Sequence, residues 1–372
     1  MIRHVQNGGY VMSNSDGRIV ILEHDSRVLR DNRLGDPHLR RFPIWLPPQY
    51  DTAPARRRFP VFYDLVGYTG SGWAHTNWRS FDESVPEQAA RLIRDRKMGP
   101  AIIVFPDCFT SLGGNQYINS SAMGRYADYL TRELIPFIDN EFRTLADRDH
   151  RGCFGKSSGG YAAIIHAMKY SKYWGAVADH SGDAHFDFVY RCCWPEALTE
   201  LSKYRTPKHR EGKYRRPKRL ESLPPGHDDG RVRHFLDSFE SKKSPTMREV
   251  HTLMMVAMAA TYDPAPSAPN GFKLPFDLET GEIIESRWNK WLTHDPVLLV
   301  KEYRDNLRTM KGIFIDCGWR DQYWIHFGCR ILSRELEKHG ITHTYQEFDG
   351  THSSIDYRMD VSLPFLYRAL KP

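Results

Sequence analysis

Residues 155–159 read Gly-Lys-Ser-Ser-Gly and stand between a short apolar run (152–154) and an alanine-rich stretch with helical spacing (161–168). G-x-S-x-G at a strand-to-helix junction is typical of a nucleophile elbow, whose central serine takes a strained backbone conformation. Flanking glycines are needed because a Cβ atom there would collide with the neighbouring strand and helix. The turn lifts the Ser157 hydroxyl clear of the sheet and places the Ser158 N–H at a helix N-terminus, where it can bind an oxyanion. Ser157 could instead be a simple helix N-cap, but an N-cap does not require glycine on both sides. The pattern therefore predicts acyl transfer with Ser157 as the nucleophile.

Two further residues suit this chemistry, and both follow Ser157 in the chain order that elbow enzymes use, acid first and histidine last. An apolar run over 311–316 ends in a glycine turn, and Asp321 lies just beyond it. An alternating run over 342–348 precedes the loop that contains His352. Asp316 is a second candidate for the acid, but it stands at the end of its strand and comes too early for the loop. Asp321 and His352 are therefore the predicted partners of Ser157.

Strands and helices alternate along most of the chain. This alternation indicates a mainly parallel sheet covered by helices on both faces, with an antiparallel edge formed by the first two or three strands. The predicted strands are 18–23, 41–46, 60–66, 101–105, 150–155, 174–179, 311–316 and 342–348. The predicted helices are 84–97, 122–142, 158–171, 297–309, 329–339 and 357–369.

Five segments match a known pattern in the same chain order. They are 34–51 with its Pro-Pro-Gln-Tyr-Asp turn, the strand and glycine loop 59–70, the segment 116–139, His-Ser-Gly-Asp at 180–183 and Asp-Gly-Thr-His at 349–352. Together they resemble the putative-esterase family of α/β-hydrolases, which includes esterase D-like, feruloyl esterase and enterochelin-esterase-like proteins. Two positions depart from the family pattern: Val66 stands where a histidine is common, and Ser158 stands where methionine is common.

The resemblance implies an α/β-hydrolase core over 1–183 and 297–372, with a helical cap inserted at 184–296. It also implies an oxyanion hole formed by the N–H groups of Tyr68 and Ser158, with the N–H of Thr69 as an alternative donor. Neither departure removes these donors, because both belong to the main chain. The residues expected to contact substrate are Thr69, Trp73, Asp183, Trp319 and Tyr323. The aromatic ones among them suggest aryl or bulky acyl esters.

The predicted cap has an uneven composition. The stretch 203–219 holds nine Lys or Arg against one acidic residue, although the net charge of the whole chain is only +6. This stretch is a solvated loop, a steering patch for an anionic substrate or a nucleic-acid site, and no nucleic-acid-binding motif accompanies it. Residues 246–260 form a methionine-rich helical pattern that can line an acyl pocket, pack within the cap, or do both.

Composition fits an ordinary cytoplasmic enzyme acting on a small-molecule ester. The N-terminus lacks the apolar core of a signal peptide, and no apolar stretch is long enough to span a membrane. Six cysteines in 372 residues are not a disulfide framework. His180, Asp183, His185 and Asp187 lie close together without a recognised metal-ligand spacing. The sequence therefore predicts no metal, no cofactor, no nucleic acid and no membrane as partners, and it leaves a homodimer open.

Other functions use the same three residues. An acyltransferase, a thioesterase such as S-formylglutathione hydrolase and a siderophore trilactone esterase differ from a carboxylesterase in substrate or in the nucleophile that resolves the acyl-enzyme. A catalytically silent binding protein is the alternative from another class, and the presence of all three residues argues against it. The sequence favours a serine carboxylesterase.

Overall fold

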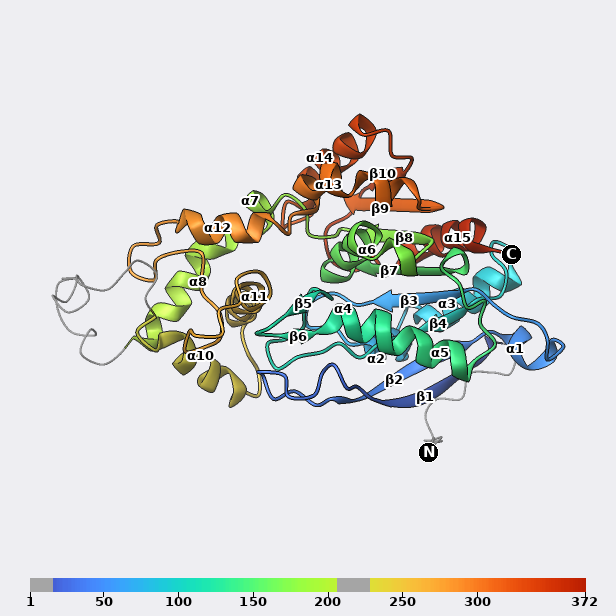
Figure 1. Ribbon diagram of the computed structural model, residues 1–372, viewed down its shortest axis with the longest axis horizontal. Coiled ribbons are helices and arrows are strands. Elements are labelled where there is room, and N and C mark those ends of the chain that lie inside the picture. Colours follow the sequence, from blue (N-terminus) through green and yellow to red (C-terminus); the bar gives the residue numbers. More distant parts are fainter. Residues whose placement is uncertain (1–15, 206–227) are drawn as a thin grey trace.

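The computed structural model describes residues 16–205 and 228–372, which fold around an eight-stranded sheet (Figure 1). The strand order is β1-β2-β4-β3-β7-β8-β9-β10, and all pairs from β4 to β10 are parallel, whereas β2 is antiparallel to both β1 and β4. The mainly parallel sheet with an antiparallel edge is thus confirmed. The strands are β1 (Arg18–Asp25), β2 (Leu39–Leu46), β3 (Val61–Leu65), β4 (Ile102–Val104), β7 (Arg151–Lys156), β8 (Ala176–His180), β9 (Gly312–Gly318) and β10 (Thr344–Phe348).

Helices flank the sheet, and a two-stranded hairpin of β5 (Asn119–Ser120) and β6 (Gly124–Arg125) lies outside it. The helices before the elbow are α1 (Pro48–Thr52), α2 (Gly72–Thr76), α3 (Val85–Arg94), α4 (Tyr126–Asp128) and α5 (Ile135–Glu141). The helices after it are α6 (Ser158–Lys169), α7 (Phe186–Val189), α8 (Trp194–Leu201), α10 (Arg231–Glu240), α11 (Met247–Tyr262), α12 (Glu285–Leu292), α13 (Pro296–Arg308), α14 (Ile325–Lys338) and α15 (Met359–Leu370).

The central strands are buried on both faces, and their alternate side chains enter two separate apolar clusters. Phe62 and Phe154 pack with residues of α3 and α15 on one face. Tyr63 and Cys153 pack with residues of α6 and α13 on the other. Two-sided burial of this kind explains why β3, Val-Phe-Tyr-Asp-Leu, has no apolar–polar alternation. Its one charged residue, Asp64, is itself buried and is held by His75.

Residues 184–296 contribute helices α7, α8, α10, α11 and α12 between strands β8 and β9. In Figure 1 helices α8, α10, α11 and α12 lie together beyond one end of the main sheet. The long α11 begins with the capping box predicted by its sequence: the Thr246 hydroxyl accepts from the Glu249 N–H, and the Glu249 carboxylate accepts from the Thr246 N–H. Over the described ranges, no helix is both long enough and apolar enough to cross a membrane.

His166 in α6 is a buried histidine with both ring nitrogens engaged. Its Nε2 donates to the carbonyl of Tyr117 at 2.9 Å, and its Nδ1 accepts from the indole N–H of Trp174 at 3.0 Å. A protonated ring would place a second donor against the Trp174 N–H. Burial lowers the pKa of His166 to about 4. Tyr117 in turn donates its hydroxyl to the carbonyl of Val66 at 2.7 Å, so this contact supports the loop after β3.

Mild acid should therefore weaken the fold through His166. Its pKa is about 4 in the folded chain and about 6.5 in an unfolded one. The stability that the neutral ring provides is present above about pH 6.5 and is lost towards pH 4, with about 2 kcal/mol lost between pH 7 and pH 5. Denaturant unfolding at both pH values should show a loss smaller by that amount in His166→Gln than in the unmodified protein. Equal losses in the two proteins would contradict this assignment.

Candidate active site

Ser157 lies at the junction of β7 and α6 with φ 58° and ψ −121°, a conformation that residues with a Cβ atom rarely adopt. The flanking glycines allow a very close approach to β3. A Cβ atom would lie 2.0 Å from the carbonyl oxygen of Leu65 if added to Gly155, and 1.6 Å from it if added to Gly159. The strained turn places Ser157 on the wall of a pocket, as expected for an elbow.

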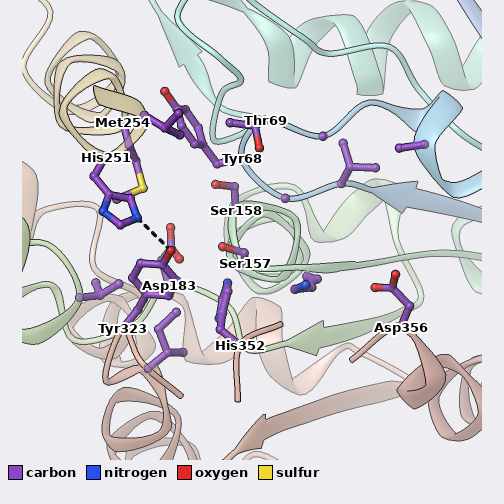
Figure 2. A pocket seen from close by; sticks show the side chains of 18 of the residues that line it. Tyr68, Thr69, Ser157, Ser158, Asp183, His251, Met254, Tyr323, His352 and Asp356 are labelled. Carbon is purple, nitrogen blue, oxygen red and sulfur yellow. Dashed lines mark hydrogen bonds between the residues drawn. The ribbon is translucent and has the colours of Figure 1, made fainter. Parts of the chain in front are cut away.

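His352 and Asp321 form a hydrogen-bonded pair beside Ser157. Asp321 Oδ2 accepts from His352 Nδ1 at 2.7 Å, and Asp321 Oδ1 accepts from the N–H of Tyr323 at 2.8 Å. The N–H of His352 donates to the side-chain oxygen of Gln322 at 2.9 Å, which fixes its loop. With Nδ1 as the donor, Nε2 is the nitrogen able to accept a proton. In Figure 2 the His352 imidazole and the Ser157 side chain point toward each other in the pocket.

Asp316, the second candidate for the acid, is engaged elsewhere. Its Oδ1 lies 2.6 Å from His180 Nδ1, and its Oδ2 accepts from Arg358 Nε at 2.7 Å. His180 Nε2 lies 2.8 Å from the hydroxyl of Ser362, so these residues also make a Ser-His-Asp arrangement. All three of its members are fully buried and none lines the pocket, so an ester could not reach them. The structure thus places Asp321, and not Asp316, against His352.

The loop after β3 packs against the elbow. A Cβ atom on Gly67 would lie 3.2 Å from the carbonyl oxygen of Lys156. The Tyr68 hydroxyl donates to the carbonyl of Leu112 at 2.7 Å, and the Thr69 N–H donates to the carbonyl of Gly113 at 2.7 Å. The Thr69 N–H is therefore committed to the main chain. The N–H groups of Tyr68 and Ser158, both residues of the pocket wall, remain the expected oxyanion donors.

The pocket has a volume of about 310 Å³, and one side of it is largely apolar. Helix α11 supplies much of this side through four residues whose spacing places them on one helix face, namely Met247, Val250, His251 and Met254. Other side chains of the same helix, among them Met255 and Met258, are buried in the core. The methionine-rich segment therefore both lines the pocket and packs within the fold.

Tyr323 connects α11 to His352. Its ring packs edge-on against the His352 ring, with centroids 4.9 Å apart. Its hydroxyl lies 3.1 Å from Nε2 of His251, and Nδ1 of the same histidine lies 3.1 Å from Glu196 (Figure 2). This contact joins the helical segment 184–296 to the loop that carries Asp321.

Asp183 is a buried carboxylate on the pocket wall. Its Oδ2 accepts from the Gln116 amide at 3.0 Å and from the Tyr190 hydroxyl at 2.8 Å, yet burial raises the pKa of Asp183. The Gln116 amide also lies 3.2 Å from the hydroxyl of Ser158. Sequence reasoning missed Gln116 and Tyr190. The partners of Gln116 lie between 42 and 142 residues away, so its local sequence carries no signal of this role.

Of the remaining expected substrate contacts, Thr69 and Tyr323 line the pocket, whereas Trp73 and Trp319 do not. The indole N–H of Trp73 donates to the carbonyl of Arg41 at 3.0 Å, which holds the ring against β2. Trp319 is 48% exposed and packs under the guanidinium of Arg320. Both aromatic rings thus lie outside the pocket.

The other side of the pocket is polar and is formed by His75, Arg79, Lys156 and Asp356. Figure 2 shows Asp356 across Ser157 and His352 from His251, Met254 and Tyr323. Sequence reasoning assigned no role to these four residues. Lys156 alone carried a signal, since a charged side chain inside a buried elbow is unexpected.

The remaining site predictions concern charge and metals. Residues 206–219 of the basic stretch 203–219 lie outside the described residues. Within the described part of the chain, no group of three or more His, Cys, Asp or Glu side chains is arranged to hold a metal ion. Asp187, one of the four clustered residues, is instead paired with Arg191 at 2.9 Å.

Comparison with known proteins identifies the group to which this geometry belongs. A family model described as Putative esterase matches residues 37–362. Two esterases of Mycobacterium tuberculosis are each 34% identical to this chain over 148 residues, a match that covers 38% of this chain and 28% of theirs. The chain therefore matches well under half the length of these curated relatives.

Solved structures show the same fold. A ferulic acid esterase superposes with a TM-score of 0.54 at 18% identity, over 95% of this chain and 98% of its own. FphF, a fluorophosphonate-binding serine hydrolase of Staphylococcus aureus, gives 0.55 at 11% identity over 94% and 98%. An S-formylglutathione hydrolase from Agrobacterium tumefaciens gives 0.53 at 16% identity over 95% and 96%. The α/β-hydrolase fold predicted from the sequence is confirmed.

Proposed function

This chain belongs to the putative esterase family, and we propose that it is a serine carboxylesterase that forms an acyl-enzyme on Ser157. One observation carries the proposal. A serine in a strained elbow shares a pocket with a histidine whose other nitrogen is held by a buried carboxylate. That combination supplies a nucleophile, a base and the group that orients the base.

The proposed reaction runs in two halves. Ser157 Oγ attacks the ester carbonyl while His352 Nε2 takes the hydroxyl proton, and Asp321 stabilises the imidazolium that forms. The N–H groups of Tyr68 and Ser158 bind the developing oxyanion. When the tetrahedral intermediate collapses, His352 gives its proton to the leaving alcohol. Water then attacks the acyl-enzyme by the same route, releases the acid and restores Ser157.

We assign hydrophobic acyl groups and aryl esters to the apolar side of the pocket. Met247, Val250 and Met254 offer side chains that adapt to ligands of different shape, and Tyr323 offers a ring beside His352. In this proposal the segment 184–296 acts as a cap, because α11 supplies this wall. The hydrogen bond between His251 and Tyr323 would then keep the wall in place during turnover.

A series of p-nitrophenyl esters from acetyl to dodecanoyl, with methyl ferulate added, tests this function. Each methylene buried against α11 should raise kcat/KM about fourfold, since it contributes about 0.8 kcal/mol. The gain should end where the acyl chain reaches the end of the pocket. Activity that does not respond to chain length would contradict the assignment of the apolar side, and absence of hydrolysis across the whole series would contradict the function itself.

A further inference from the structure

On the polar side of the pocket, Lys156 is a cation with no direct hydrogen-bond or ion-pair partner among the described residues. Lys156 precedes the nucleophile, lines the pocket and is largely removed from solvent. Within the described ranges, its ammonium group makes no hydrogen bond and has no carboxylate within ion-pair distance. Burial lowers the pKa of Lys156, as expected for an ammonium group without a close counter-ion. A buried cation of this kind costs stability unless something pairs with it.

The neighbouring charges are all paired. His75 Nδ1 lies 2.6 Å from the buried carboxylate of Asp64. Arg79 is bound to Asp356 and also lies 3.4 Å from Asp82. Among the carboxylates, Asp356 acts most strongly on the charge of Lys156, but it is bound directly to Arg79. Arg79 therefore faces two carboxylates, whereas Lys156 has none within ion-pair distance among the described residues.

The other carboxylates of the pocket have direct partners of their own. The Asp321 carboxylate accepts hydrogen bonds from His352, from the N–H of Tyr323 and from the thiol of Cys317. Asp183 lies in the network of Gln116 and Tyr190. The Lys156 ammonium group, without a direct partner among the described residues, therefore lies on the side of the pocket opposite the apolar wall.

We propose that Lys156 recognises a carboxylate carried by the ester substrate, a few bonds from the carbonyl that Ser157 attacks. This proposal rests on the proposed esterase function and narrows its substrate class to esters with one anionic end. The carboxylate would supply the counter-ion that Lys156 lacks. A charge-assisted hydrogen bond is stronger than a neutral one.

Two matched ester pairs test the proposal, with the ratio of kcat/KM for the anionic ester to that for the neutral ester as the readout. Mono-p-nitrophenyl adipate against p-nitrophenyl hexanoate places the charge on the acyl side. p-Acetoxybenzoate against its methyl ester places it on the leaving group. The Lys156→Met variant should lower the ratio roughly 10- to 100-fold for at least one pair, the value of a hydrogen bond to a charged group. The pair that responds identifies the end of the substrate that binds Lys156.

A second variant should act in the opposite direction. Asp356→Asn removes the negative charge that acts most strongly on Lys156 and keeps the shape of the side chain, so the ratio should rise roughly 2- to 5-fold. Lys301→Met removes a positive charge from the exposed face of α13 and should leave both ratios unchanged. Lys156→Met should melt no lower than the unmodified protein, because it relieves the burial of an unpaired charge.

The outcomes separate this inference from the proposed function. If no ester is hydrolysed, the esterase function fails. If neutral esters are hydrolysed but neither Lys156→Met nor Asp356→Asn changes either ratio, the carboxylate site is wrong and the esterase function stands. A clear loss of thermal stability in Lys156→Met, with unchanged ratios, would assign the lysine a structural role instead.

Discussion

Replacing Ser157 by alanine should lower kcat for p-nitrophenyl esters by about 10⁶-fold, the loss seen when a triad nucleophile is removed. Alanine cannot form the acyl-enzyme, while His352, Asp321 and the oxyanion donors remain in place. These remaining groups should still give about 10³- to 10⁴-fold catalysis over water. The measurement is steady-state hydrolysis of the best p-nitrophenyl ester. The protein must be highly purified, because traces of other esterases would otherwise account for the residual activity of the variant.

The matched control for this variant is Ser171→Ala. Ser171 lies in the short turn after α6, and the pocket wall does not include it. This substitution should leave kcat unchanged. Both variants should melt close to the unmodified protein, because alanine has the same Cβ atom as serine and can adopt the same backbone conformation. Comparable kcat values for Ser157→Ala and the unmodified protein would remove Ser157 from the mechanism.

Replacing Asp321 by asparagine should lower kcat by about 10⁴-fold, as for the equivalent change in other triads. The Asn amide would donate toward His352 Nδ1 and thereby favour the tautomer with its proton on Nε2. That nitrogen could then no longer accept the proton of Ser157. Because the carboxylate already accepts from Tyr323 and His352 in a buried position, the loss should appear in kcat far more than in KM.

Asp316→Asn should behave in the opposite way. Asp316 is bound to His180 and Arg358 away from the pocket, so its loss breaks a buried ion pair and costs about 3–5 kcal/mol of stability. The protein that stays folded should keep its kcat. Unfolding in denaturant and activity per folded molecule distinguish the two aspartates. A large loss of kcat in Asp316→Asn with unchanged activity in Asp321→Asn would reverse the assignment of the acid.

The elbow and its partners could be predicted from the sequence because their signals are local. Close approach of α6 to β3 requires glycine at positions 155 and 159. These two glycines flank Ser157 at fixed spacing, so the pentapeptide is easily recognised in the sequence. Asp321 and His352 follow strands whose apolar runs stand out. The sheet follows for the same reason, since its central strands are continuously apolar and its helices have helical spacing.

The parts that escaped prediction depend on contacts between distant segments. Helix α14 begins at Ile325, whereas the spacing predicts a start at 329. Gly328 lies within this helix, and a Cβ atom there would lie 2.2 Å from the carbonyl oxygen of Ala184, so glycine at this position serves close packing. Trp73 and Trp319 illustrate the opposite error. Aromatic residues near the ends of strands suggest a pocket, but the Trp73 ring is hydrogen-bonded to Arg41 and the half-exposed Trp319 ring lies against Arg320, both outside it.

The polar side of the pocket is the clearest example of a feature that the sequence does not predict. His75, Arg79 and Asp356 come from segments that no sequence pattern brings together, and the state of Lys156 becomes visible only when its neighbours are known to be paired with one another. The sequence shows a charge beside the nucleophile. The structure shows that this charge has no partner in the described part of the protein.

The most direct test of the account is to treat the protein with a fluorophosphonate and locate the adduct by peptide mass spectrometry. The account predicts one adduct per chain, on Ser157, formed at the rate at which ester hydrolysis is lost. Prior incubation with a slowly hydrolysed ester should protect against labelling, because the same oxygen carries the acyl group. Ester hydrolysis that persists with Ser157 fully labelled, or an adduct on another residue, would contradict the claim that Ser157 is the nucleophile.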